Sequence, residues 1–337
     1  MSMKSREIRL RRIPQGLPGD GDFDITEVEL APPSAGELLV RNLWLTVDPY
    51  MRGRMTGRDS YVPAFRIGQT LEGGAIGRVV ASGGHAKFQV GDLVRSSFGW
   101  REAFRSDGKG LEKIDATRGR AEAFLGALGM PGLTAYGGLL LHGKPKAGET
   151  VFVSGAAGAV GSIVCQIAKI KGCRVVASAG SPAKTAWLSD IAKVDATIDY
   201  HARRDLDAAL AEACPDGFDI YFDNVGGSHL EAALGRMRQN GRIVMCGAIS
   251  RYNDDRPAAG PNNLFLAVAR RLTLQGFIVT DHWNLMPQFL IEMGGWITEG
   301  RMHWHETIVD GIAAMPGAFI GLFRGDNLGK MLVRLPD

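Results

Sequence analysis

The segment Val151–Gly161 places the tightest constraint on the fold, because a strand-like apolar run leads directly into closely spaced glycines. Glycines follow this run at positions 155, 158 and 161, and apolar residues then recur at 160, 163, 164, 167 and 168 with the spacing of a helix. A strand, a glycine turn and a helix in this order predict a dinucleotide-binding unit. The small residues let the backbone approach a pyrophosphate, and the helix N-terminus offers N–H groups and a partial positive charge.

The second half of the chain continues this texture, with apolar strands separated by helical stretches. The strands are expected at Val151–Ser154, Arg174–Ser178, Ala196–Ile198, Phe218–Asp223, Arg242–Cys246 and Leu272–Val279. Strands that alternate with helices predict right-handed crossovers and a parallel sheet.

The first part of the chain has a different pattern. From Glu27 to about Val94 the segments are short and strand-like, with glycine and proline turns between them, which predicts a small antiparallel barrel or sandwich. The last segment returns to a short strand at Lys330–Arg334 and is expected to rejoin this first region. We therefore expect a first domain over residues 1–128 and 304–337, interrupted by a nucleotide-binding domain over residues 129–303.

The second strand of the nucleotide unit indicates which dinucleotide is bound. An NAD site usually has an acidic residue about 20 residues beyond the glycine turn, to hold the ribose 2′-hydroxyl. No acidic residue occurs between Ser162 and Ser189, and Ala177–Lys184 offers hydroxyls and a cation instead. This favours NADP(H), with a solvated residue in the first turn of a helix as the alternative for Lys184.

Composition excludes several other classes of protein. Lys and Arg exceed Asp and Glu by 39 to 36, and the basic residues are dispersed except near Arg9–Arg12, which argues against binding to nucleic acid. Four cysteines without a two-residue spacing indicate a reducing compartment. The first twenty residues lack a signal-peptide core, and glycines and prolines break the most apolar stretch, so we expect a cytoplasmic protein without a membrane span.

Six motifs resemble those of the zinc-independent medium-chain dehydrogenase/reductases. They occur in the order Leu45–Arg52, Gly132–Tyr136, Ala156–Ser162, Ala179–Lys184, Phe222–Gly227 and Cys246–Asn253. Within that family the chain is similar to the branch of leukotriene 12-hydroxydehydrogenase/prostaglandin reductase, alkenal double-bond reductase and curcumin reductase. The resemblance implies an α/β fold in which a Rossmann doubly wound parallel sheet is inserted into a GroES-like antiparallel β-barrel catalytic domain.

The resemblance also implies an activity, namely NADPH-dependent reduction of the carbon–carbon double bond of an α,β-unsaturated aldehyde or ketone. Its partner would be a small enal or enone, and a homodimer is typical of the family. Quinone reduction is the alternative within enzymes, because both reactions need only a flat apolar slot over the nicotinamide. A non-catalytic NADP-binding or nucleic-acid-binding protein is the alternative from a different class.

Carried over by motif, the resemblance assigns residues to the cofactor. Gly158, Ala159, Val160 and Gly161 would face the pyrophosphate, while Lys184 and Tyr200 would contact the 2′-phosphate. The remaining cofactor contacts would come from Asn224, Cys246, Gly247, Ala248, Ile249, Ser250, Tyr252, Phe277, Ile278, Val279 and Asn327. Several have simpler interpretations: Asn224 could cap the next helix, Phe277–Val279 could be sheet core, and Cys246 could be a small apolar residue at a strand end.

Catalysis would fall to a tyrosine. Hydride addition to an enone leaves negative charge on the carbonyl oxygen, so the site needs a hydrogen-bond donor there, either a tyrosine hydroxyl or the cofactor's own ribose hydroxyl. Tyr252 is our choice for the donor, and Tyr50 and Tyr61 are the substrate-binding candidates, although both could be surface aromatics of the barrel.

No metal is expected to take part. Where zinc-dependent relatives carry cysteine and Gly-His-Glu ligands, this chain has Asp48–Met51 and Leu71–Ala75. His303 and His305 are separated by one residue, but no carboxylate or cysteine completes a ligand set with them.

Overall fold

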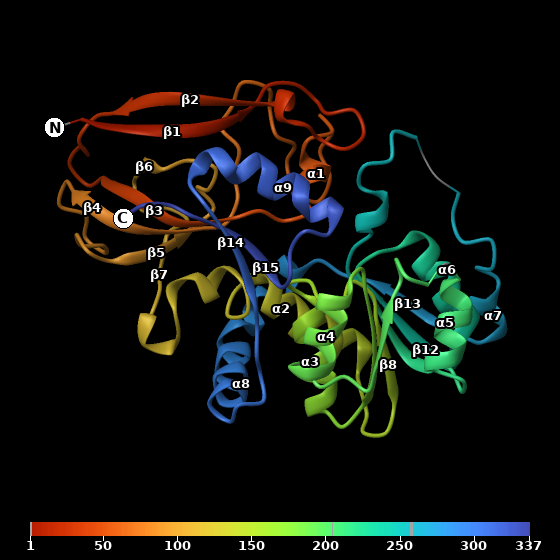
Figure 1. Ribbon diagram of the computed structural model, residues 1–337. Helices are drawn as coiled ribbons and strands as arrows, with labels where there is room; N and C mark the ends of the chain where they lie inside the picture. The colour runs from red at the N-terminus through yellow and green to blue at the C-terminus, as the bar shows by residue number, and fades with distance from the viewer. Residues whose placement is uncertain (1, 204, 257–258) are drawn as a thin grey trace. The chain divides into compact units, whose positions relative to one another are not determined.

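The computed structural model describes residues 2–203, 205–256 and 259–337 (Figure 1). The chain divides into two compact units. The first unit comprises Met1–Leu125, Glu306–Asn327 and Met331–Asp337, and the second comprises Gly126–His305 with Leu328–Lys330. The second unit thus interrupts the first unit in sequence. Three residues of the C-terminal segment, Leu328–Lys330, also belong to the second unit.

The first unit is a barrel-like arrangement of antiparallel strands. Its strands are β1 (Met3–Leu10), β2 (Phe23–Leu30), β3 (Leu38–Thr46), β4 (Ala75–Ser82), β5 (Leu93–Ser96), β6 (Ala103–Ser106), β7 (Glu112–Lys113), β14 (Glu306–Asp310) and β15 (Lys330–Arg334). The large sheet has the order β14-β15-β3-β4-β5-β7, with β6 also paired to β3, while β1 and β2 form a separate ribbon. The predicted strand Lys330–Arg334 is confirmed, and it pairs antiparallel with β3.

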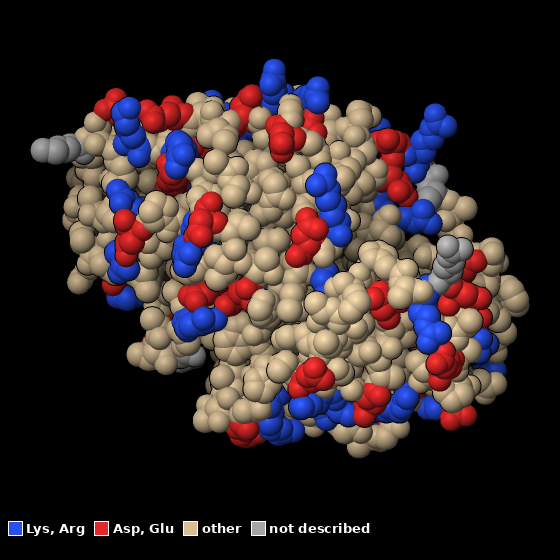
Figure 2. Space-filling model, in the orientation of Figure 1, with Lys and Arg blue, Asp and Glu red and all other residues tan. Residues whose placement is uncertain are grey.

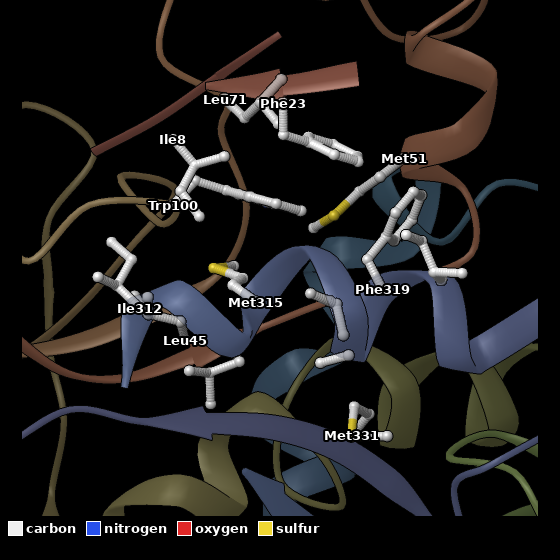
Figure 3. Packing of buried hydrophobic residues seen from close by; sticks show 14 of the residues in the cluster. Ile8, Phe23, Leu45, Met51, Leu71, Trp100, Ile312, Met315, Phe319 and Met331 are labelled. Carbon is white, nitrogen blue, oxygen red and sulfur yellow. The ribbon is translucent and has the colours of Figure 1, made fainter. Parts of the chain in front are cut away.

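Aliphatic, aromatic and methionine side chains together fill the main core of the first unit (Figure 3). Trp100 is fully buried, stacks on Phe23 at a ring distance of 5.9 Å, and meets the edge of Phe319 at 6.0 Å. Phe319 comes from helix α9 (Met315–Arg324), whose apolar face covers this core, and Met51 comes from the short helix α1 (Met51–Arg54). The C-terminal segment is therefore bound to the first unit by packing as well as by strand pairing.

The second unit is a doubly wound Rossmann domain. Its strands are β8 (Thr150–Val153), β9 (Arg174–Ala179), β10 (Ala196–Asp199), β11 (Phe218–Asp223), β12 (Met237–Met245) and β13 (Thr273–Gly276). Their order in the sheet is β10-β9-β8-β11-β12-β13, and the recorded pairings are all parallel. This is the 3-2-1-4-5-6 order of dinucleotide-binding domains, so the predicted fold class is confirmed.

Helices connect and cover this sheet. They are α2 (Met130–Gly137), α3 (Gly161–Ile170), α4 (Pro182–Asp190), α5 (Leu206–Ala213), α6 (Gly227–Arg236), α7 (Leu266–Ala269) and α8 (Met286–Thr298). Figure 1 shows α3 next to α4 and, apart from them, α5 next to α6. The apolar positions 163, 164, 167 and 168 of α3 are all buried, as the helical spacing predicts. No helix among the described residues is long and apolar enough to cross a membrane.

Two strand boundaries were predicted incorrectly. β12 begins at Met237 instead of Arg242. Its early part pairs with β11 in an irregular register, which the apolar pattern of the sequence does not indicate. The expected strand Leu272–Val279 is wrong at its end: β13 stops at Gly276, and a 3₁₀ helix starts at Val279. Phe277 and Ile278 therefore lie in the connection that leaves the sheet.

Candidate functional site

The glycine turn after β8 leads into α3 with no room for larger side chains. An ideal Cβ on Gly161 would lie 2.5 Å from the carbonyl oxygen of Gly155, which is closer than real Cβ contacts allow. Residues 158–160 are half-buried, and within the described part of the chain the backbone N–H groups of Ala159 and Val160 have no acceptor. Unpaired amides at a helix N-terminus suit a phosphate, so the turn fits a pyrophosphate.

The returning C-terminal segment packs directly on this turn. The backbone N–H of Gly329 donates to the carbonyl of Ala157 at 2.8 Å, and Gly329 forms a parallel bridge with Gly158. Gly329 has φ +66°, and a Cβ there would lie 1.9 Å from the carbonyl oxygen of His305. Only glycine fits this position, which lies two residues after the predicted cofactor residue Asn327.

A cluster of hydrogen-bonded polar residues joins the C-terminal ends of β8 and β11. We call Ser154, Tyr221, Asp223 and Asn224 the Asp223 network. Asp223 is 1% exposed, and its Oδ1 accepts from the hydroxyls of Tyr221 at 2.7 Å and Ser154 at 3.2 Å. The Asn224 amide Nδ2 donates to the carbonyl of Ser154 at 2.8 Å, so Asn224 does not cap α6.

The same carboxylate also fixes the loop that follows β11. Oδ1 of Asp223 accepts the backbone N–H groups of Val225 at 2.9 Å and Gly226 at 2.8 Å. Burial raises the pKa of Asp223, and these hydrogen bonds oppose the rise. Asp223 therefore carries the polar contacts that shape the turn into α6, where backbone conformation alone would leave two amides unpaired.

The loop after β12 is bound to the same place. The backbone N–H groups of Cys246 and Gly247 donate to the carbonyl oxygen of Asp223 at 2.9 and 3.1 Å. Further along, the Ser250 N–H donates to the carbonyl of Val225 at 3.2 Å, and its hydroxyl donates to the same oxygen at 2.7 Å. Three loops, after β8, β11 and β12, are thus held together at one edge of the sheet, where open α/β sheets bind ligands.

Tyr252 lies at the end of this loop with its hydroxyl turned back toward the strand. The backbone N–H of Ala248 donates to the Tyr252 hydroxyl oxygen at 3.2 Å, and no acceptor for the hydroxyl proton is found among the described residues. Burial is the main cause that raises the pKa of Tyr252, so the phenol stays protonated. It can therefore donate one hydrogen bond to a ligand.

Cys246 is not activated. Burial, followed by the charge of Asp223, raises the pKa of the Cys246 thiol to about 12, so no thiolate forms near neutral pH. This agrees with the interpretation of Cys246 as a small residue at a strand end.

The ends of β9 and β10 form a second corner of the same edge, made of Gly180, Ser181, Lys184, Tyr200 and His201, which we call the β9–β10 corner. Ser181 is the N-cap of α4 and accepts from the Lys184 N–H, so Lys184 is the third residue of that helix. An ideal Cβ on Gly180 would lie 2.6 Å from the Tyr200 hydroxyl oxygen. Tyr200 therefore lies beside the start of α4, and both residues predicted for the 2′-phosphate belong to one corner.

Phe277–Val279 follow β13 and are half-buried, so they are not sheet core. The Phe277 ring packs beside the π-helical segment Gly138–Gly143, where a Cβ on Gly138 would lie 2.5 Å from its Cζ. Their predicted contact with nicotinamide stays a prediction.

Tyr50, Tyr61 and Asn327 belong to the first unit. Tyr50 directly precedes α1 and is half-buried, and burial raises its pKa. Tyr61 is 60% exposed, which agrees with the alternative of a surface aromatic. Their predicted roles stay predictions.

Sequence reasoning missed three residues of the Asp223 network: Ser154, Tyr221 and Asp223. A signal was present, because Tyr221 and Asp223 are two residues apart and therefore share one face of a strand whose opposite face is apolar. A polar pair on a central strand needs a partner from a neighbouring strand, which Ser154 supplies.

Two further observations concern ligand clusters and the charge of the surface. No three His, Cys, Asp or Glu side chains gather to hold a metal ion anywhere in the described ranges. On the face shown in Figure 2, basic and acidic side chains are interspersed.

Comparisons with known proteins identify the family. The matching family models are described as an N-terminal domain of oxidoreductase, over residues 6–114, and a zinc-binding dehydrogenase, over residues 159–294. The NADPH-dependent curcumin reductase of Escherichia coli is 42% identical over 98% of this chain and 97% of its own. The chain belongs to the zinc-independent medium-chain dehydrogenase/reductase family.

Two further members of this family are similar over nearly their full length. The NADP⁺-dependent 2-alkenal reductase of Nicotiana tabacum is 40% identical over 98% of this chain and 97% of its own. The crystal structure of CurA from Vibrio vulnificus in complex with NADPH has a TM-score of 0.93 and 39% identity, covering 98% of this chain and 99% of that one. The predictions of family, of enzyme class and of NADP(H) as cofactor are confirmed.

Proposed function

We propose that this oxidoreductase uses NADPH to reduce the carbon–carbon double bond of α,β-unsaturated aldehydes and ketones. The observation that carries the proposal is the full-length similarity to reductases named for curcumin and for 2-alkenals. Both named substrates have a double bond conjugated to a carbonyl group. The site supports the same chemistry, because it offers a protonated phenol as a hydrogen-bond donor.

The residues present fit NADPH. Gly161 admits no Cβ, and the amides of Ala159 and Val160 are available to the pyrophosphate, as the glycine turn requires. Lys184 and Tyr200 would hold the 2′-phosphate in the β9–β10 corner, and no acidic residue follows the glycine turn between Ser162 and Ser189. Asn224 and the loop Cys246–Tyr252 would hold the remainder, since the Asp223 network fixes both.

The proposed chemistry uses few protein groups. When bound, NADPH supplies a hydride for the β-carbon of the substrate. Tyr252 donates a hydrogen bond to the carbonyl oxygen, where negative charge develops as the double bond is reduced. A proton then adds to the α-carbon, so that one hydride and one proton saturate the bond and the carbonyl is retained.

A steady-state assay tests the proposal. NADPH oxidation is measured with an enal, an enone, a saturated aldehyde and a quinone at matched concentrations. We expect turnover of the enal and the enone, none of the saturated aldehyde, and the same rates after dialysis against a chelator, because no ion is needed to polarise the carbonyl. Turnover of the quinone alone would replace the proposal with quinone reduction.

We also propose that two copies of the chain associate, in a cytoplasmic setting that keeps its four cysteines reduced. β13 ends the parallel sheet, and an open strand edge is a site for pairing. Nearby in sequence, Phe265 is 68% and Val268 81% exposed. Light scattering during size-exclusion chromatography should give twice the chain mass of 36.3 kDa, and the single-chain mass would contradict this.

A further inference from the structure

Two histidines that are far apart in sequence meet in the second unit. The Nε2 atoms of His142 and His282 lie 3.2 Å apart, with ring centroids at 5.2 Å. His142 is near the end of the π-helical segment Gly138–Gly143, and His282 lies in the 3₁₀ segment Val279–Leu285. Single π-turns are rare and are frequent at functional sites. We propose that His142 and His282 form a binding site for a divalent transition-metal ion such as Zn²⁺ or Cu²⁺.

The spacing of the two nitrogens matches what such an ion requires. With Zn–N bonds of about 2.0–2.1 Å, two ligands lie about 3.3 Å apart at a tetrahedral angle and about 2.9 Å apart at a right angle. The measured 3.2 Å falls between these values. Turning each ring about its side-chain torsions directs both lone pairs toward one ion, and the proton that the two Nε2 atoms share moves to Nδ1 of the donor ring.

The surroundings of His142 also favour a metal. Partial burial, with smaller contributions from His282 and Lys144, lowers the pKa of His142. A neutral imidazole is the form that binds metal ions. Both rings are half-buried, so solvent and ions can reach them.

The coordination would be completed by water. No third His, Cys, Asp or Glu joins the pair within the part of the chain that the structure describes. A two-histidine site with open positions binds ions reversibly, which differs from the closed four-ligand arrangement of a structural zinc site. The ion would therefore be an exchangeable ligand and would not be required for folding or for the proposed reaction.

Aromatic rings around the pair keep the two histidines close together. The Phe277 ring lies 5.2 Å from the His142 ring and 6.3 Å from the His282 ring. Phe277 is in turn supported by the edge of Phe222, at 6.5 Å. The two histidines are thus held against one aromatic ring before any ion arrives.

Titration calorimetry of the full-length, tag-free protein with ZnCl₂ tests the proposal without any activity measurement. We expect one equivalent of Zn²⁺ to bind at pH 7.5, and the affinity to fall about tenfold or more in both His142→Gln and His282→Gln. The matched control is His305→Gln, which replaces another histidine of the same unit and should leave the affinity unchanged. Binding should also weaken at pH 5, where protons compete for the imidazoles.

A second probe places the ion within the fold. Trp283 directly follows His282, so Cu²⁺ should quench its fluorescence, and the quenching should be reduced in Trp283→Phe and in His142→Gln. The proposal is overturned if no saturable equivalent of Zn²⁺ binds. It is also overturned if both histidine variants bind Zn²⁺ as the unsubstituted protein does, or if they lose only thermal stability.

Discussion

The two corners of the sheet edge are built differently. At β8, β11 and β12 the loops are held by the Asp223 network, in which one carboxylate oxygen accepts two hydroxyls and two backbone amides. At β9 and β10 the residues predicted to bind the 2′-phosphate, Lys184 and Tyr200, have half-buried side chains. The first corner is fixed before a cofactor arrives, whereas the second offers side chains that change cofactor preference without reshaping the backbone.

The largest effect is expected at the fixed corner, for Tyr252→Phe. This change keeps the ring and deletes the one donor directed at the growing charge, so kcat with an enone should fall about 10²–10³-fold while NADPH affinity holds. Rates and cofactor binding are measured separately. A fall of only about tenfold would indicate that the ribose hydroxyl does most of the donating, and an unchanged kcat would remove Tyr252 from the catalytic residues.

The next effect concerns the network itself. Asp223→Ala leaves two backbone amides and two hydroxyls without their acceptor, so the free energy of unfolding should fall by about 3 kcal/mol or more, and NADPH binding should weaken with it. Asp223→Asn is the matched control, since its carbonyl oxygen can still accept from the amides of Val225 and Gly226. Denaturant unfolding of both variants measures this effect. If the alanine variant were as stable as the unsubstituted protein, the Asp223 network would not fix its corner more firmly than the β9–β10 corner is fixed.

At the β9–β10 corner the expected effect is selective. Lys184→Ala should weaken NADPH binding about 10- to 100-fold, because a charge-assisted contact to phosphate contributes roughly 1.5–3 kcal/mol, and should leave NADH binding and stability nearly unchanged. Affinities for both cofactors are compared in the two proteins. A parallel loss for NADH would mean that Lys184 supports the fold of the corner and does not read the 2′-phosphate.

The smallest effect follows from the raised pKa of Asp223. Because burial raises this pKa in the folded state above its unfolded value, folding favours the protonated acid, and that contribution is lost as pH rises above about 4, the ordinary range of an aspartate. The stability of Asp223→Asn relative to the unsubstituted protein should therefore improve between acid and neutral pH. A relative stability that declines over this range would show that hydrogen bonding outweighs burial at Asp223.

Local patterns predicted the parts of this site that lie within one segment. The Val151–Gly161 turn is such a part, because strand, glycines and helix adjoin in sequence, and steric limits at Gly161 act within the same turn. Strand ends were less predictable: the apolar residues Phe277–Val279 continue the pattern of β13, although the chain leaves the sheet after Gly276.

Contacts between distant segments could not be predicted. The bond between Ser154 and Tyr221 depends on β8 and β11 lying side by side, which the strand order determines and the residue pattern does not. His142 and His282 are separated by 140 positions and meet only because two irregular helical turns pack together. The β12 bulge likewise depends on register with β11.

The most direct test of the central claim follows one hydrogen atom. NADPH carrying deuterium at the transferable C4 position is incubated with the enzyme and an enal, and the product is analysed by NMR. The account predicts a saturated aldehyde with one deuterium on the β-carbon and a proton from solvent on the α-carbon. An alcohol with deuterium on the former carbonyl carbon would contradict it, because the enzyme would then reduce the carbonyl group and not the double bond.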